Sequence, residues 1–345
     1  MKIKYNKTLV AIVTVFCLMA SVVTAGDRGK FGTSAAPELL IPVGSVGTSL
    51  GGSNLSYVTG IDAMFWNPAG LARLNSSTAE VMFSHMNYFA DMNMQYFAGA
   101  SDIGLGVVGA SIRSFNIGEI LETTELQPEG TGTVFQPTYL VASLSFARQM
   151  TDKIRFGTNV KLISESVANV SANGIAFDFG IQYIGGSSGL AFGIAIKNLG
   201  SAMTFDGPGL ERSYVENGQT VTRKIILEPF DLPTNLEIGA SYTYAMNTQN
   251  SLNISTAFQN SGFSSDEYKF GLEYNYNNNF YLRGAFNYRP QAKDNGESLF
   301  GPSFGAGVKY PFSGVMLGFD YAFRVMSRDR FSEGTNQFFT LNVGF

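Results

Sequence analysis

The sequence predicts an all-β membrane protein: a 14-stranded antiparallel outer-membrane β-barrel with an N-terminal hatch segment that contains a short helix. Three observations lead to this fold class: the composition, alternating segments of about ten residues, and long loops confined to one side. Charged residues make up only 14% of the chain and aromatic residues 13%, with 39 Gly. Few charges and many Tyr, Phe and Gly are unusual for a soluble enzyme and typical of a barrel wall facing lipid. We therefore expect no enzymatic activity.

Residues 1–25 have the pattern of a secretory signal peptide and are excluded from the fold. Three Lys lie within the first seven residues, an apolar stretch follows over 9–19, and small residues precede a cleavage site near Ala25. The apolar stretch is too short to span a membrane. An uncleaved N-terminal anchor is the alternative. Either way the chain is expected to be exported.

Charge and cysteine content narrow the destination. Without the three N-terminal Lys, 20 basic residues remain against 27 acidic residues, a net charge of −7 that argues against a nucleic-acid partner. The single Cys, Cys17, lies in the predicted signal peptide, and Phe16 stands where a lipoprotein signal needs a small residue. No later stretch approaches 18 consecutive apolar residues, so no membrane helix is expected. These features predict the bacterial outer membrane, with outer-membrane lipid around the wall.

Residues 26–76 are predicted to form the hatch segment. Residues 44–60 alternate Gly and Ser with few charges. A disordered linker usually carries more charge, so we favour a compact segment packed against the barrel.

The helix is expected within Asp62–Leu74, which contains the only Trp. Asn67 is a favourable N-cap, and Pro68 suits the first helical position because its missing N–H costs nothing there. The alternative is a surface helix that joins two halves of the protein. The apolar residues on one helical face are Phe65, Ala69 and Ala72.

Residues 77–345 are predicted to form the barrel, because side chains alternate between apolar and polar in segment after segment. Each segment is about ten residues long, the length that a tilted strand needs to cross a bilayer. The fourteen segments are 77–87, 92–101, 103–115, 137–150, 153–167, 172–184, 190–200, 234–246, 250–260, 266–277, 279–289, 303–312, 315–326 and 337–345.

The connections between these segments support the count. All long loops, 116–136, 201–233, 290–302 and 327–336, join an odd to an even segment, while the other connections are short. Outer-membrane barrels place their long loops on one side in this way. An extra hairpin within 201–233 is an open alternative.

The inner face is predicted to carry charges of both signs. One interpretation is a wide, water-filled porin; the other is a narrow lumen crossed by ion pairs and filled by a plug. Fourteen strands are fewer than the 16–18 of water-filled porins, which favours the occluded lumen. The expected polar network is Arg155, Lys161, Asp178, Glu237, Lys269, Glu273, Arg283, Arg289, Asp320 and Arg324, with Lys197 and Lys309 on the same face.

The last segment ends the chain on an aromatic residue. Phe339, Leu341, Val343 and Phe345 face one way, and this pattern resembles the barrel-assembly signal of bacterial outer-membrane proteins. The alternative is an ordinary last strand of a soluble β protein.

Three features that suggest chemistry have simpler explanations. Gly104–Gly109 matches G-x-G-x-x-G, but the glycines fall within a predicted strand and no helix follows, so close backbone approaches in the wall explain them better. His85 is the only His, which leaves no basis for a His-based metal or catalytic site. An acidic cluster in loop 116–136 is interpreted as solvated, with a Ca²⁺ or partner site as the alternative. We therefore expect no cofactor.

The N-terminal motifs resemble those of the PorV/PorQ family, which is related in fold to the FadL family of transporters. They are Leu39-Leu-Ile-Pro-Val-Gly44, a Gly-rich stretch, and Ile61-Asp-Ala-Met-Phe-Trp-Asn-Pro-Ala-Gly-Leu71. In FadL-like barrels this part of the chain forms a hatch in the lumen. The resemblance assigns to the hatch motif Asp62, Phe65, Trp66, Asn67, Pro68, Ala69 and Gly70.

The resemblance implies two functions of different classes. PorV/PorQ proteins serve type IX secretion, which implies that loops 116–136 and 201–233 bind secretion-system or cargo proteins. The alternative is a FadL-like passive channel for hydrophobic small molecules such as fatty acids and aromatics. That function requires an apolar cavity beside Phe65 and Trp66, and the polar inner face counts modestly against it.

Overall fold

The computed structural model describes residues 28–75, 78–217, 219–290, 299–326 and 334–345. The predicted signal peptide and its cleavage site lie outside the described residues.

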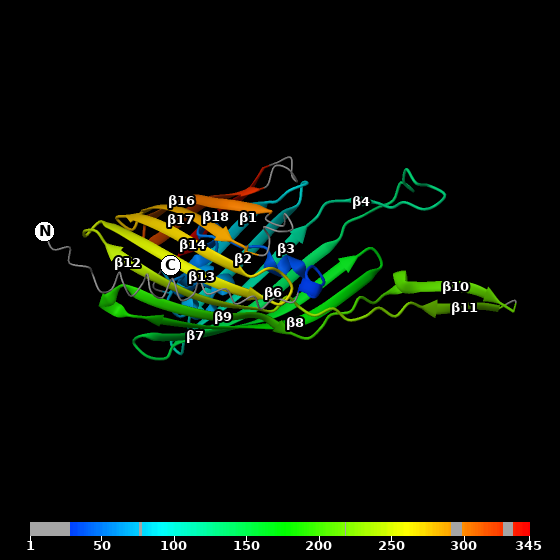
Figure 1. Ribbon diagram of the computed structural model, residues 1–345, viewed down its shortest axis with the longest axis horizontal. Coiled ribbons are helices and arrows are strands. Elements are labelled where there is room, and N and C mark those ends of the chain that lie inside the picture. Colours follow the sequence, from blue (N-terminus) through cyan, green and yellow to red (C-terminus); the bar gives the residue numbers. More distant parts are fainter. Residues whose placement is uncertain (1–27, 76–77, 218, 291–298, 327–333) are drawn as a thin grey trace.

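Fourteen antiparallel strands form a closed barrel, in which β1 pairs with both β2 and β18 (Figure 1). The predicted fold class is confirmed, and each predicted segment matches one strand of the wall. The strands of the wall are β1 (Ala79–Asn87), β2 (Asn93–Asp102), β3 (Val107–Asn116), β6 (Thr138–Gln149), β7 (Ile154–Val167), β8 (Val170–Ile184), β9 (Leu190–Gly200), β12 (Asn235–Ala245), β13 (Asn250–Ser261), β14 (Glu267–Tyr276), β15 (Phe280–Tyr288), β16 (Phe300–Phe312), β17 (Val315–Met326) and β18 (Thr335–Gly344).

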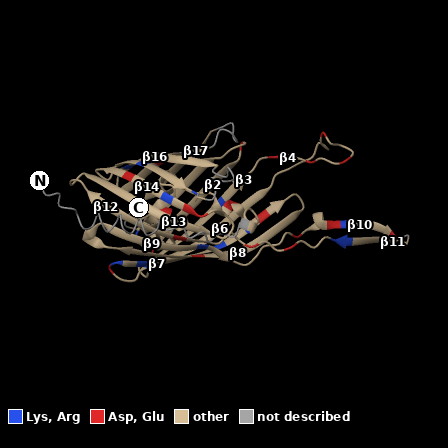
Figure 2. Ribbon diagram, in the orientation of Figure 1, with Lys and Arg blue, Asp and Glu red and all other residues tan. Residues whose placement is uncertain are grey.

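Alternation along each strand separates a lipid face from a lumen face. In β8, Phe177, Phe179 and Ile181 are exposed on the outside, while Asp178 and Gln182 are buried on the inside. Most residues of the wall strands are uncharged, and charged residues also lie in the loops (Figure 2). Within the described part of the chain, no helix has the length and apolar content needed to cross a membrane.

Two hairpins extend beyond one rim of the barrel (Figure 1). The first pairs β4 (Ile120–Leu121) with β5 (Val134–Phe135), and the second pairs β10 (Glu211–Glu216) with β11 (Gln219–Lys224). The extra hairpin within 201–233 therefore exists, but it lies in a loop and not in the wall. We call this rim the loop end and the opposite rim, with its short connections, the turn end.

Residues 28–75, the described part of the predicted hatch segment, lie inside the barrel (Figure 1), and we keep the name hatch for them. The Gly/Ser-rich segment 44–60 is almost entirely buried, so the prediction that it packs compactly is confirmed. The hatch elements are η1 (Arg28–Lys30), η2 (Pro37–Leu40), α2 (Ser45–Ser49), η3 (Ser53–Ser56), η4 (Gly60–Asp62), α3 (Ala63–Trp66) and η5 (Pro68–Ala72); η6 (Gly186–Ser188) and η7 (Pro208–Leu210) lie in connections.

The prediction of one helix within 62–74 is wrong in detail. Asn67 is extended, with φ −157° and ψ 106°, and separates α3 from η5. Proline disfavours the helical conformation in the residue before it, so Pro68 ends the first helix while starting the second. The roles of Asn67 as N-cap and Pro68 as first-turn residue are confirmed.

The explanation of the Gly104–Gly109 motif also needs correction. Gly104 and Gly106 have φ of 81° and 153° and form the turn before β3, where other residues would be strained. Gly109 lies in β3, and a Cβ there would come 2.9 Å from the sulfur of Met64 in the hatch. A Cβ on Gly106 would also come 2.6 Å from the Ala147 carbonyl oxygen in the wall, so two of the three glycines serve close approaches of the kind predicted, and Gly104 does not.

We expect Leu162→Arg to destabilise the barrel. Leu162 is 57% exposed near the middle of β7 on the lipid face, and a charge at the bilayer midplane costs roughly 2–4 kcal/mol. Denaturant unfolding in lipid vesicles measures the loss. Leu162→Ala is the control, with a much smaller effect; equal stability of the two variants would show that this face does not meet lipid.

Candidate functional site: hatch and lumen

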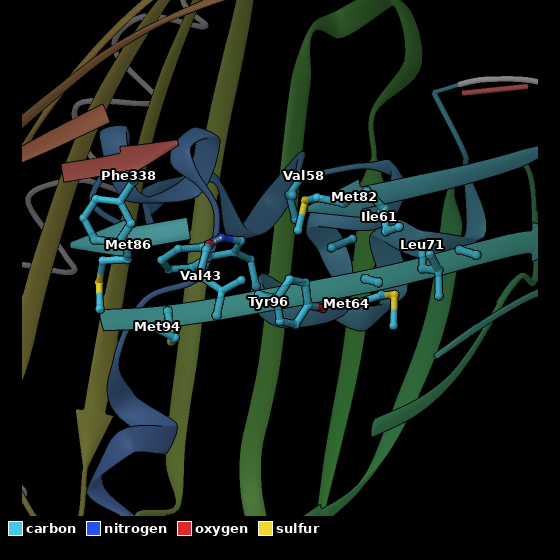
Figure 3. Close-up of a cluster of buried hydrophobic side chains, with 14 of the residues drawn as sticks. Val43, Val58, Ile61, Met64, Leu71, Met82, Met86, Met94, Tyr96 and Phe338 are labelled. Carbon is cyan, nitrogen blue, oxygen red and sulfur yellow. Dashed lines mark hydrogen bonds between the residues drawn. The ribbon is translucent and has the colours of Figure 1, made fainter. Parts of the chain in front are cut away.

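One side of the hatch packs through apolar side chains onto β1, β2 and β18 (Figure 3). Full burial of one such side chain stabilises the folded protein by about 1.5–3 kcal/mol. The hatch supplies Val43, Val58, Ile61, Met64 and Leu71, and the wall supplies Met82, Met86, Met94, Tyr96 and Phe338.

The other side of the hatch approaches the wall backbone closely. Two wall glycines, Gly157 in β7 and Gly180 in β8, face Pro68 and Asn67, and a Cβ on either would overlap hatch atoms. The same region buries Ala69 and Gly70 completely or nearly so. Because these two wall residues are glycines and have no side chain, the Asn-Pro-Ala-Gly motif has room to pack against the wall.

Asn67 joins three parts of the structure. Its Nδ2 donates to the Leu55 carbonyl at 3.0 Å and to the Ile181 carbonyl in the wall at 3.3 Å. Its Oδ1 accepts from the Ala69 backbone N–H at 3.2 Å. The side chain is fully buried, so an amide, with both donors and an acceptor, is the group that satisfies this position.

Three hydroxyl pairs connect the Gly/Ser-rich part of the hatch to the wall. Each pair is a buried hydrogen bond of 2.7–2.9 Å, and these small residues let the hatch backbone lie close to the strands. The pairs are Ser45 with Thr340, Ser53 with Ser255, and Ser56 with Ser241.

Trp66 and Phe65 form the apolar centre of the hatch. The Trp66 Nε1 donates to the Val43 carbonyl at 3.1 Å, and the two rings meet edge to face at 4.9 Å. The Lys197 ammonium lies 5.2 Å from the Phe65 ring and 5.4 Å from the Trp66 ring, within cation–π range.

The predicted polar network lines the lumen, but its ion pairs run along the wall and do not cross the lumen. The hatch occupies the centre, so each charge reaches a partner one or two strands away. The buried pairs are Lys161–Asp178 at 2.7 Å, Lys197–Glu237 at 2.9 Å, Lys269–Glu237 at 3.1 Å, and Arg283 with both Glu273 and Asp320 at 2.6 Å.

Three predicted arginines stand outside these buried pairs. Arg289 pairs with Glu267 at 2.9 Å near the loop end. Within the described part of the chain, the one hydrogen bond of the Arg155 side chain is to Gln182, at 3.5 Å. Arg324 lies 3.6 Å over the Phe300 ring, and among the described residues its Nε has no hydrogen-bond partner.

Within the residues that the structure describes, the sequence analysis missed five buried carboxylates: Glu38, Glu80, Glu165, Asp266 and Glu267. Glu38 in η2 lies within the hatch, and Glu80 in β1 accepts from the Ile61 N–H at 2.9 Å. Glu80 shares the inner face of β1 with Met82 and Met86, so its strand does not show a uniformly polar lumen face. Its regular alternation with outward residues was the one available signal.

Phe339, Leu341, Val343 and Phe345 lie on the outer face of β18 and beyond its end, as the alternation predicts. The β18 strand closes the barrel by pairing with β1. Their role as an assembly signal stays a prediction.

The hatch divides the lumen into two cavities. A cavity of 280 Å³ lies toward the loop end beside Phe65 and Trp66. A cavity of 740 Å³ lies toward the turn end, where Asp62, Arg73 and Arg155 line it. Among the described residues, no group of three or more His, Cys, Asp or Glu side chains is placed to hold a metal ion.

Comparison with known proteins places the fold. No protein-family model matches the sequence, and no curated protein matches it. Its structure resembles the CymD monoaromatic hydrocarbon channel at 13% identity, over 91% of this chain and 97% of that one, with a TM-score of 0.55.

Two further solved structures are similar. The Pseudomonas putida toluene transporter TodX has 14% identity over 87% of this chain and 96% of its own, with a TM-score of 0.54. A Pseudomonas aeruginosa FadL homologue has 11% identity over 88% and 98%, with a TM-score of 0.50. The chain thus has the fold of FadL-type outer-membrane barrels, and these neighbours are channels or their relatives and not enzymes.

We expect Asn67→Asp to loosen the hatch. The aspartate would lose both amide donors and place a carboxylate against two carbonyl oxygens. Each buried group left unpaired costs about 1–3 kcal/mol, and more when charged. Small antibiotics should therefore enter cells that make the variant faster than cells that make the wild-type protein.

The matched control is Asn247→Asp, at an exposed turn where the Asn247 side chain accepts hydrogen bonds through its Oδ1. An aspartate can keep those bonds, so permeability should not change. Equal leakage from the two variants would contradict the role of Asn67 as an anchor.

The Asp62 carboxyl should make stability depend on pH. Burial is the main reason that the pKa of Asp62 rises to about 7; Asp320 and Glu80 raise it further, and Lys309 and Arg283 oppose them. The folded protein therefore holds a proton that the unfolded chain releases near pH 4. The free energy of unfolding should fall as the pH rises from about 4 to 7.

Thermal unfolding of wild type and Asp62→Asn at pH 5 and pH 8 measures this effect. The side chain at position 62 of the variant cannot ionise. The melting temperature of the variant, relative to that of wild type, should therefore be higher at pH 8 than at pH 5. A difference between the two proteins that is the same at both pH values would contradict the assignment.

Proposed function

We propose that the protein is a passive channel for hydrophobic small molecules. The observation that carries this proposal is the cavity beside Phe65 and Trp66, which the hatch lines with apolar residues such as Leu39 and Ile41 and the wall lines with polar and charged residues. Concave sites with apolar and aromatic linings are typical of small-molecule binding. The likeness in fold to hydrocarbon channels supports the same function.

The hatch would act as the selective barrier. It separates the cavity at the loop end from the larger cavity at the turn end. Hydrogen bonds fasten it to the wall, among them three hydroxyl pairs and those of Asn67, Asn159 and Asn287. Hydrogen bonds of this kind contribute about 0.5–1.5 kcal/mol each, so part of the hatch could rearrange by breaking a few of them while the closed ring of strands stays paired.

The comparisons offer no support for a role in type IX secretion, so we do not prefer that function. The hairpins in loops 116–136 and 201–233 do expose apolar side chains, including Leu126 and Ile226. Partner binding through these loops stays a prediction.

Uptake of labelled toluene tests the channel function. A bacterial host that lacks its own hydrophobic-uptake barrels should accumulate toluene faster when it makes this protein. Uptake of a polar solute of similar size should not change. Equal toluene uptake with and without the protein would overturn the proposal.

A disulfide lock tests the hatch. The Ser53 and Ser255 hydroxyls are 2.7 Å apart, so Cys at both positions should crosslink η3 to β13. We expect the oxidised Ser53→Cys/Ser255→Cys variant to take up toluene several-fold more slowly, and a reductant to restore uptake. An oxidised variant with full uptake would show that passage does not require this part of the hatch to move.

A further inference from the structure

The cavity toward the loop end has an unusual surplus of positive charge. Among the described residues, its lining includes two carboxylates, Glu237 and Glu267. Asp178 stands behind one of the lysines and neutralises it. The cationic side chains that line the cavity are Lys161, Lys197, Lys269, Arg289 and Arg324.

The ion pairs in this cavity do not neutralise its surplus of positive charge. Lys197 and Lys269 share the single carboxylate of Glu237, at 2.9 and 3.1 Å. Arg324 forms no ion pair with any described residue, and its Nε is buried without an acceptor within that same set. The Arg324 side chain is half-buried, but an Nε donor enclosed without an acceptor is costly, and a bound anion would relieve that cost.

Aromatic rings occupy the same cavity. Phe65 and Trp66 border it from the hatch, and Tyr88 and Phe300 border it near the loop end. Arg324 already stacks on Phe300, and Lys197 lies over Phe65 and Trp66. An aromatic ligand could therefore lie against these rings while its charged group meets the cations beside them.

Size restricts the ligand further. The cavity measures 280 Å³, slightly below the roughly 300–1,000 Å³ of typical small-molecule sites. A single substituted ring suits this space better than a long alkyl chain.

We propose that this cavity binds small aromatic carboxylates, with the carboxylate at Arg324 and the ring against Phe300 and Tyr88 beside it. The proposal rests on the channel function and specifies its substrate class. The site would favour aromatic acids over neutral hydrocarbons of the same size, because only the acids complete the pairing of the cationic side chains.

Trp66 provides a direct readout, because it is the only Trp of the chain and lines the cavity. Full-length protein purified in detergent is titrated with benzoate, benzyl alcohol and benzylamine while Trp fluorescence is followed. A charge-assisted hydrogen bond contributes about 1.5–3 kcal/mol, so benzoate should bind roughly tenfold or more tightly than benzyl alcohol. Benzylamine should bind most weakly, and added salt should weaken only benzoate binding.

Arg324→Met should weaken benzoate binding about tenfold and leave benzyl alcohol binding nearly unchanged. Lys309→Met is the matched control, because Lys309 lines the other cavity, and it should bind benzoate like wild type. Heat-modifiable migration on gels checks that each variant is folded. If Arg324→Met does not fold, the salt dependence of binding and the comparison of the three ligands in wild type still test the proposal.

Equal affinity for benzoate and benzyl alcohol in wild type would overturn the proposal, as would full benzoate affinity in a folded Arg324→Met variant. The channel function fails separately, through toluene uptake. Tight benzoate binding without toluene uptake supports the aromatic-acid site and refutes the hydrocarbon channel.

Discussion

The closed ring of backbone hydrogen bonds is the constraint on which the rest of the structure depends. In lipid an unpaired strand edge is prohibitively costly, so β18 must return to β1. Closure at fourteen strands creates an interior too wide for wall side chains alone to fill. A segment of the chain has to occupy that space, and residues 28–75 do so.

The hatch fills the lumen with two different kinds of contact. Apolar side chains such as Met64 and Leu71 pack against one side of the barrel. On the other side, Ser hydroxyls and Asn67 bond directly to the wall, where glycines such as Gly180 leave room. The low charge and high Gly and Ser content of this segment follow from that placement, because a long or charged side chain would hold the backbone away from the strands.

The hatch also determines where charge lies. Since it fills the centre of the lumen, the lumen charges pair along the wall, as Arg283 does with Glu273 and Asp320. The cavity at the loop end keeps the least balanced set of charges together with most of the aromatic rings beside the hatch. A passive channel needs such a site to be polar enough to orient a ligand and apolar enough to accept its ring.

Local sequence determined much of this protein. Period-two alternation set the strands, the inner and outer faces, and the side of the long loops, because each depends only on neighbouring residues. The capping roles of Asn67 and Pro68 were likewise local. Tertiary structure alone decided what depends on distant segments: the break of the helix at Asn67, the partners of Lys269 and Arg283, and the burial of Glu38. Strand register and hatch position bring these groups together, and a one-dimensional pattern does not encode such distances; the two cavities beside the hatch arise for the same reason.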